Sequence, residues 1–182
     1  MIRLPASARA FVAALALLSA AVPAEAAAPQ PRKPLELERV LGRWYEIART
    51  PNPNQRDCQG ATSDWIRKGP DRFEVVQTCR KGSPSGPARV MKCAATLVDA
   101  VTNAKWRLSF FGGAVKQEYW LIDRADDHSW MLFGTPGGNY VWILSRRPVM
   151  SDAGRQEALG RAQQLGYDIR RLVFPAVAHA AL

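Results

Sequence analysis

The chain has 182 residues, a length that allows one compact domain and not two of ordinary size. Of these residues 47% are hydrophobic and 23% are charged, and the formal net charge is +9. Six Trp, six Phe and four Tyr need burial, which excludes disorder as the main state. Three Cys and two His at no ligand spacing exclude a zinc framework, so neither a metal nor a cofactor is expected.

The first segment has the pattern of an export signal. A short start with two Arg and no acid precedes an apolar run over 10–21, and a small-x-small pattern ends at Ala26. The run is shorter than the roughly 20 apolar residues that cross a membrane. We therefore predict a signal peptide over 1–26 and a flexible segment over 27–34. Because no Cys follows the apolar run to carry a lipid anchor, the expected location is periplasmic or secreted.

Residues 35–41 predict a short helical turn, and strand-like runs separated by turn residues follow it. The runs lie at 44–49, 61–67, 72–79, 89–98, 105–111, 118–123, 129–133 and 140–145. Short strands joined mostly by hairpins predict an all-β fold, either an antiparallel barrel or a sandwich. The pattern alone does not decide between the two.

The period then changes to that of a helix over 151–165. Its apolar residues fall on one face, with Ser151 as the N-cap and Gly166 as the stop. That face consists of Ala158, Leu159, Ala162 and Leu165. Such an apolar stripe needs a partner, so the helix is expected to lie on the wall of the β-structure. The run 171–175 predicts one further strand.

Two motifs frame the strands. Gly42-Arg43-Trp44 opens the first, and the last ends at Arg146. Gly42 allows a tight turn, and Trp44 is expected to plug one end of a barrel. Arg146 is expected to lie across the Trp44 indole and to donate hydrogen bonds to free carbonyls there.

With these motifs the sequence resembles the lipocalin family, and within it bacterial lipocalins of the outer-membrane-lipoprotein and apolipoprotein D type. The similarity covers 35–175, and its matching stretches include GRWYEIAR (42–49), LSFFG (108–112), YWLID (119–123), GTP (134–136) and YVWILSRRP (140–148). The resemblance implies one domain over 35–175 with a tail over 176–182. It also implies an eight-stranded up-and-down barrel with a C-terminal helix on its wall, open at one end, that binds a hydrophobic molecule. At Ala125 and His128 the chain departs from the Asp and Tyr that the family usually carries, which calls the usual hydrogen bonding of that turn into question.

Strand alternation predicts which side chains line the cavity. If Trp44 faces inward, Glu46 and Ala48 do so too. An inward Glu46 needs a polar partner or ordered water. If Arg146 shares the side of Trp44, Tyr140, Trp142 and Leu144 also face inward. The full set of predicted ligand-binding residues is Glu46, Ala48, Trp65, Phe110, Tyr119, Leu121, Tyr140, Trp142 and Leu144.

The cysteines predict one disulfide. With a hairpin turning at 69–70, Cys58 and Cys79 lie almost opposite each other, within bridging reach. The competing pair is Cys79 with Cys93. The next turn sets Cys79 opposite residue 88 or 89 instead, which favours Cys58–Cys79 and leaves Cys93 a free, buried thiol.

No nucleophile–base pair accompanies Ser145 or His128, and Glu46 is the lone interior carboxylate, so no catalytic residue and no enzyme is predicted. We predict that the protein carries or stores a fatty acid, a lysophospholipid or a similar membrane lipid in the cell envelope. This role would include conditions of stress. The alternatives are a lipid-modifying enzyme and a protein-binding signalling or inhibitor barrel. The Lys and Arg are scattered, which argues against nucleic acid and allows peripheral contact with an anionic membrane surface.

Overall fold

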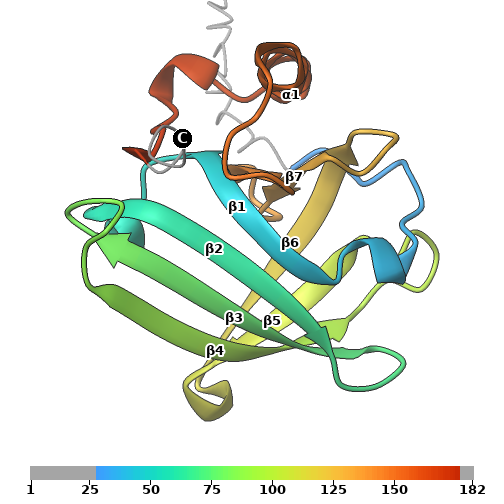
Figure 1. The fold of residues 1–182 in the computed structure, drawn as a ribbon. Helices are drawn as coiled ribbons and strands as arrows, with labels where there is room; N and C mark the ends of the chain where they lie inside the picture. Colours follow the sequence, from blue (N-terminus) through green and yellow to red (C-terminus); the bar gives the residue numbers. More distant parts are fainter. Residues whose placement is uncertain (1–27, 177–182) are drawn as a thin grey trace, which may run out of the picture.

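The computed structural model describes residues 28–176, so the predicted signal peptide and residues 177–182 lie outside the described part. The chain forms a closed barrel of eight strands in sequence order (Figure 1). All neighbours are antiparallel, and the first strand pairs with the last, which leaves no free sheet edge. The predicted up-and-down barrel is confirmed. Its strands are β1 Gly42–Arg49, β2 Cys58–Arg67, β3 Arg72–Lys81, β4 Ala88–Leu97, β5 Lys105–Phe110, β6 Val115–Arg124, β7 Trp130–Gly134 and β8 Val141–Ser145.

The connections divide between the two ends of the barrel. The 3-10 helix η1, Leu37–Arg39, lies next to the start of β1 and defines what we name the closed end. Antiparallel alternation places four connections at the opposite end, which we name the open end: β1–β2, β3–β4, β5–β6 and β7–β8. Two of these contain short 3-10 helices, η2 Pro53–Gln55 and η3 Phe111–Gly113.

The helix α1, Asp152–Gln164, packs outside the barrel, as Figure 1 shows. The Ser151 hydroxyl accepts a hydrogen bond from the Gly154 N–H at 3.2 Å, which confirms the predicted N-cap. Ala158 and Ala162 are fully buried against outward side chains of the strands, in a cluster that includes Trp130 and Ile143. The predicted apolar face is the face that packs.

The barrel interior holds a separate core, contributed by side chains from every strand. Its centre is a group of aromatic rings that we name the aromatic floor: Trp65, Phe73, Trp106 and Phe133. The Trp65 ring lies 5.3 Å from the Trp106 centroid and 5.8 Å from that of Phe133. These spacings are those of direct ring contact, so the rings fill this level of the barrel.

Both flanking segments contact the barrel. Ala28 N–H donates to Pro136 O at 2.8 Å, and the Lys33 ammonium lies 3.0 Å from Asp126 Oδ1. These contacts belong to the segment for which the sequence predicts flexibility. The further strand predicted over 171–175 is reduced to an isolated bridge between Arg49 and Val173, preceded by the 3-10 helix η4, Ile169–Arg171.

Candidate functional site

The closed end is sealed by the predicted pair of residues. Trp44 is 1% exposed, and its indole N–H donates to Val40 O at 2.8 Å. The Arg146 guanidinium carbon lies 3.6 Å from the centroid of the Trp44 ring. Its Nη1 also donates to Leu41 O at 2.8 Å. Gly42 has φ +84°, a conformation that strains other residues. The structure confirms the contact predicted between the two motifs.

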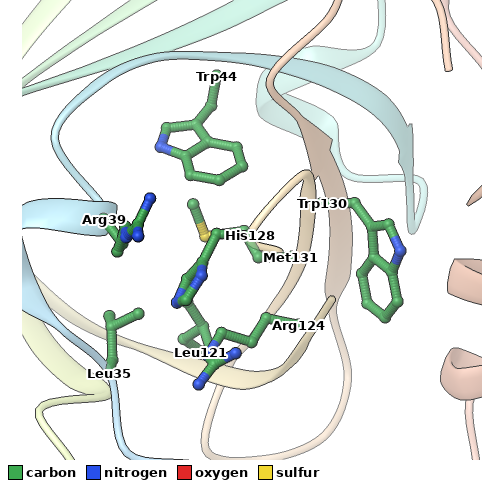
Figure 2. A pocket seen from close by; sticks show the side chains of 8 residues that line it. All are labelled: Leu35, Arg39, Trp44, Leu121, Arg124, His128, Trp130 and Met131. Atoms are coloured by element: carbon green, nitrogen blue, oxygen red, sulfur yellow. The ribbon is translucent and has the colours of Figure 1, made fainter. Parts of the chain in front are cut away.

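Beneath Trp44 the side chains leave a gap with no room for a water molecule (Figure 2). Leu121 and Met131 face it from the barrel wall, while Trp130 points to the other side of β7, toward α1. His128, one of the two departures from the family pattern, also lines it. In that turn the Asp127 carboxylate, next to His128, accepts a hydrogen bond from the Ser129 N–H at 2.9 Å. The turn therefore has a carboxylate that makes a local hydrogen bond to its backbone. Within residues 28–176, this gap therefore offers no entry for a ligand.

Toward the open end, inward side chains of β6 and β8 remain partly open to solvent, next to the floor residues Trp106 and Phe133 with which they pair. Leu121 is 1% exposed, whereas Tyr119, on the same face of β6 and nearer the open end, is half-buried. The same change occurs on β8 between Leu144, 8% exposed, and half-buried Trp142. The Tyr119 and Trp142 rings lie 5.6 Å apart, and the Tyr140 ring lies 6.0 Å from Trp142. These three rings form what we name the aromatic mouth.

A buried ion pair lies beside the mouth. Glu46 is 5% exposed and accepts from Arg49 Nη1 at 2.6 Å and from Gln55 Nε2 at 2.6 Å. The inward Glu46 therefore has the polar partner that its burial requires. Burial raises the pKa of Glu46, against the lowering effect of the Arg49 guanidinium. Arg49 Nη2 donates to Cys58 O at 3.1 Å, so the pair also holds the start of β2.

Gln55 connects this pair to the mouth. Its side-chain oxygen accepts from the Trp142 indole N–H at 2.9 Å and from Asn52 Nδ2 at 2.8 Å. The β1–β2 connection is thereby tied to the inside of the barrel. Sequence reasoning missed both Arg49 and Gln55, since neither an Arg at a strand end nor a Gln in a loop signals a buried role.

The inward placement predicted for Ala48 is wrong. A β-bulge between Glu46 and Ala48 shifts the pairing of β1 with β8, so that Glu46 lies opposite Leu144 and Ala48 opposite Ile143. One extra residue reverses the side-chain alternation beyond it. Ala48 consequently packs in the outer cluster under α1, and Arg49 lies on the side of Glu46.

The other predicted lining residues divide into a buried group and a half-buried group, and the buried group includes Phe110 at the open end of β5. Trp65, Phe110, Leu121 and Leu144 are buried in the interior core. Glu46 is buried in the ion pair, and Tyr119, Tyr140 and Trp142 form the mouth. Among these predicted residues, only the half-buried group exposes surface that an incoming molecule can touch without displacing packed side chains.

A disulfide ties two strands at the open end. Cys58 and Cys79 are bonded, with their Cα atoms 5.5 Å apart, as the hairpin register predicts. Cys79 pairs with Arg89 across β4, which confirms why Cys93 is not its partner. Cys93 is free and 3% exposed, and burial raises the pKa of its thiol to about 11.

A closed eight-stranded antiparallel barrel, plugged by a Trp under an Arg and with a helix on its wall, defines the class of small calyx-shaped barrels. The chain belongs to the lipocalin family: the model of the lipocalin-like domain matches residues 35–177. It is similar to the outer membrane lipoprotein Blc of Escherichia coli K12, with 30% identity over 76% of this chain and 77% of the relative. It is also similar to temperature-induced lipocalin-1 of Arabidopsis thaliana, with 29% identity over 77% and 78% of the two chains.

Solved structures share the fold. Insecticyanin from the tobacco hornworm Manduca sexta superimposes with a TM-score of 0.67 at 18% identity, over 84% of this chain and 86% of insecticyanin. The siderocalin Ex-FABP superimposes with a TM-score of 0.54 at 16% identity, over 75% and 93% of the two chains. At these identities the likeness concerns the barrel architecture.

Proposed function

We propose that this lipocalin binds a small hydrophobic molecule at the aromatic mouth and carries or stores it. The observation that supports the proposal is the change in exposure along β6 and β8, where inward residues pass from buried Leu121 and Leu144 to half-buried Tyr119 and Trp142. When an apolar molecule covers aromatic surface that is open to water inside a barrel, the free energy of the system falls, which favours binding.

The ligand class that we propose is a fatty acid, a lysophospholipid or a similar membrane lipid. Each buried methylene contributes about 0.8 kcal/mol, so a long acyl chain gains enough free energy to offset the cost of association. The aromatic floor limits how deep the acyl chain can reach, so the acyl chain would lie on the open-end side of Trp65 and Phe133. The candidates for direct contact are Tyr119, Tyr140 and Trp142, with Glu46 and Phe110 at the edge and Leu121, Leu144 and Trp65 below.

The similarity to proteins named as outer membrane lipoproteins supports a place in the cell envelope. The predicted signal peptide supports the same location, either periplasmic or secreted. The positive net charge further supports peripheral contact with an anionic membrane surface. A binding role suits the interior, because its carboxylate Glu46 is held by Arg49 and Gln55 instead of facing an open cavity.

The test is a fluorescence titration of delipidated protein with fatty acids of increasing chain length. We expect saturable one-to-one quenching, with a dissociation constant on the order of micromolar for the long chains and steep weakening as the chain shortens. Trp142→Phe should remove most of the signal change. The matched control is Trp120→Phe, because Trp120 packs with the outer cluster and under the Lys105 ammonium, 4.3 Å from its ring. Affinity independent of chain length, or no binding, would overturn the proposal.

A further inference from the structure

A bulky apolar side chain is displayed at the open end. Phe111, in the β5–β6 connection, is 75% exposed and has φ +52°. A large residue in this left-handed region is uncommon and costs conformational energy that Gly or Asn would avoid. Two more apolar residues are exposed toward this end: Val115, at the base of the same hairpin, is 50% exposed, and Val90, near the start of β4, is 54% exposed. Solvation alone does not account for such a placement.

Unpaired cations are spread over the open-end connections and the adjoining strands. We name them the basic rim: Arg56, Arg80, Lys81, Arg89, Lys92 and Lys116. Within residues 28–176 none of the six forms an ion pair with a carboxylate. The Arg89 guanidinium donates to Asn54 O at 2.9 Å, which brings the β3–β4 hairpin against the β1–β2 connection. Asp57 is the only acidic residue in the four open-end connections.

The closed end is organised differently. There Arg67 pairs with Glu38 at 2.7 Å and Arg39 with Glu36 at 3.4 Å, while Arg146 is occupied by Trp44 and by backbone carbonyls. Carboxylates therefore neutralise part of the positive charge at the closed end, where Arg72 and Arg147 are exposed without an ion pair within residues 28–176, whereas none of the six cations of the basic rim has a carboxylate partner there.

We propose that the open end is a docking surface for an anionic lipid bilayer. Phe111, with Val115 and Val90, would enter the interface between headgroups and acyl chains, and the basic rim would contact the lipid phosphates. An exposed aromatic side chain combined with Lys and Arg is the arrangement that binds peripheral proteins to such surfaces. The inference deepens the proposed function and rests on it for its purpose, because docking in this orientation turns the aromatic mouth toward the source of its ligand.

The first arm of the test concerns the apolar tip. The purified protein is mixed with vesicles of phosphatidylglycerol and phosphatidylcholine, and the bound fraction is measured by co-sedimentation. Phe111→Asn should lower the partition coefficient on the order of tenfold, since a buried aromatic side chain is lost. The same change should not destabilise the fold, because Asn tolerates a positive φ. The matched control is Val101→Asn, since Val101 is 87% exposed in the β4–β5 connection at the closed end. The partition coefficient of this control should equal that of the parent protein. Residues 1–26 are the same in every variant, so they cannot cause a difference between variants.

The second arm concerns the charge. Lys92→Gln with Lys116→Gln should weaken binding about fivefold for each charge removed. Arg72→Gln with Arg147→Gln, two exposed cations at the closed end, makes the same change in net charge and should have little effect. Vesicles of phosphatidylcholine alone should bind poorly, and added salt should weaken binding to the anionic vesicles.

Three results would overturn the docking surface: no binding of the parent to anionic vesicles, equal losses for Phe111→Asn and Val101→Asn, or equal losses for the two double variants. Binding to the anionic vesicles that depends on charge and not on Phe111 would show electrostatic adsorption alone and would reject the insertion of the apolar tip. The fatty-acid titration is performed without vesicles. A protein that binds vesicles and no acyl ligand would refute the carrier proposal alone, and the converse would refute the docking surface alone.

Discussion

The guanidinium of Arg146 lies over the indole of Trp44, with its central carbon 3.6 Å from the ring centroid. Trp44 is on β1 and Arg146 follows β8, the two strands whose pairing closes the barrel. The contact thus joins the beginning and the end of the sheet at the closed end. Burial lowers the pKa of Arg146, although the group stays charged.

A double-mutant cycle tests the energy of this contact. Trp44→Ala removes a buried aromatic plug and should lower the free energy of unfolding by about 3–5 kcal/mol. Arg146→Ala should lower it by about 1–2 kcal/mol, because a partly desolvated cation–π contact is lost. The double variant should be less destabilised than the sum, as measured by urea unfolding. Additive effects would mean that the two side chains do not interact.

A second prediction concerns Gly134 and Tyr167. A Cβ at Gly134 would lie 2.7 Å from the Tyr167 hydroxyl, closer than van der Waals contact allows. Gly134→Ala should therefore destabilise the protein by about 1–3 kcal/mol. Tyr167→Phe should restore much of this loss in the double variant. Alone it should be nearly neutral, because the hydroxyl is buried and has no hydrogen-bond partner within the described residues.

Gly160 provides the control for that substitution. It lies in α1, and nothing lies within 4 Å of the position its Cβ would take. Gly160→Ala should stabilise the protein by about 0.5–1 kcal/mol through helix propensity. Thermal unfolding of the four variants makes the comparison, and a Gly134→Ala protein as stable as the parent would contradict the close approach.

A third prediction concerns Gln55 as the tie across the mouth. Gln55→Leu removes the partners of the Trp142 indole N–H and of one Glu46 oxygen, and should cost about 1–3 kcal/mol. The β1–β2 connection should loosen, so that acrylamide quenches Trp142 more strongly. Trp142→Phe in each background isolates the contribution of that indole. Asn54→Ala, an exposed change in the same loop, should leave quenching unaltered, and equal quenching in both variants would refute the tie.

A fourth prediction follows from the buried thiol. Burial raises the pKa of Cys93 from its usual value of 9.0 to about 11. The folded protein therefore holds this proton more tightly than the unfolded chain does. Its contribution to stability is complete below pH 9 and is lost as the pH rises toward 11. Urea unfolding across this range should show a shallower decline for Cys93→Ala than for the parent, and the Cys58–Cys79 bond is checked by mass at each pH. Parallel declines would show that the thiol titrates normally in the folded protein.

Much of the architecture follows from local patterns in the sequence. The runs of alternating residues indicated the eight strands, and the helical period indicated the face of α1, because solvent and core impose these periods directly. The Cys58–Cys79 bond followed from hairpin register, since a short turn sets which residues lie opposite each other. The closed-end contact between Trp44 and Arg146 was predictable because their motifs frame the strands.

The candidate site was decided by the tertiary structure. Alternation assigns Ala48 to the interior, but the bulge on β1 turns it outward and brings Arg49 to Glu46. Whether an inward ring fills the barrel or lines an opening was equally hidden, because Trp65 and Trp142 have the same local pattern. Closure of the barrel brings Trp65 against Trp106 and Phe133 from distant strands, whereas Trp142 meets a loop glutamine near solvent. Such contacts depend on the register of the whole sheet and on side-chain volumes across it, which no local stretch of sequence specifies.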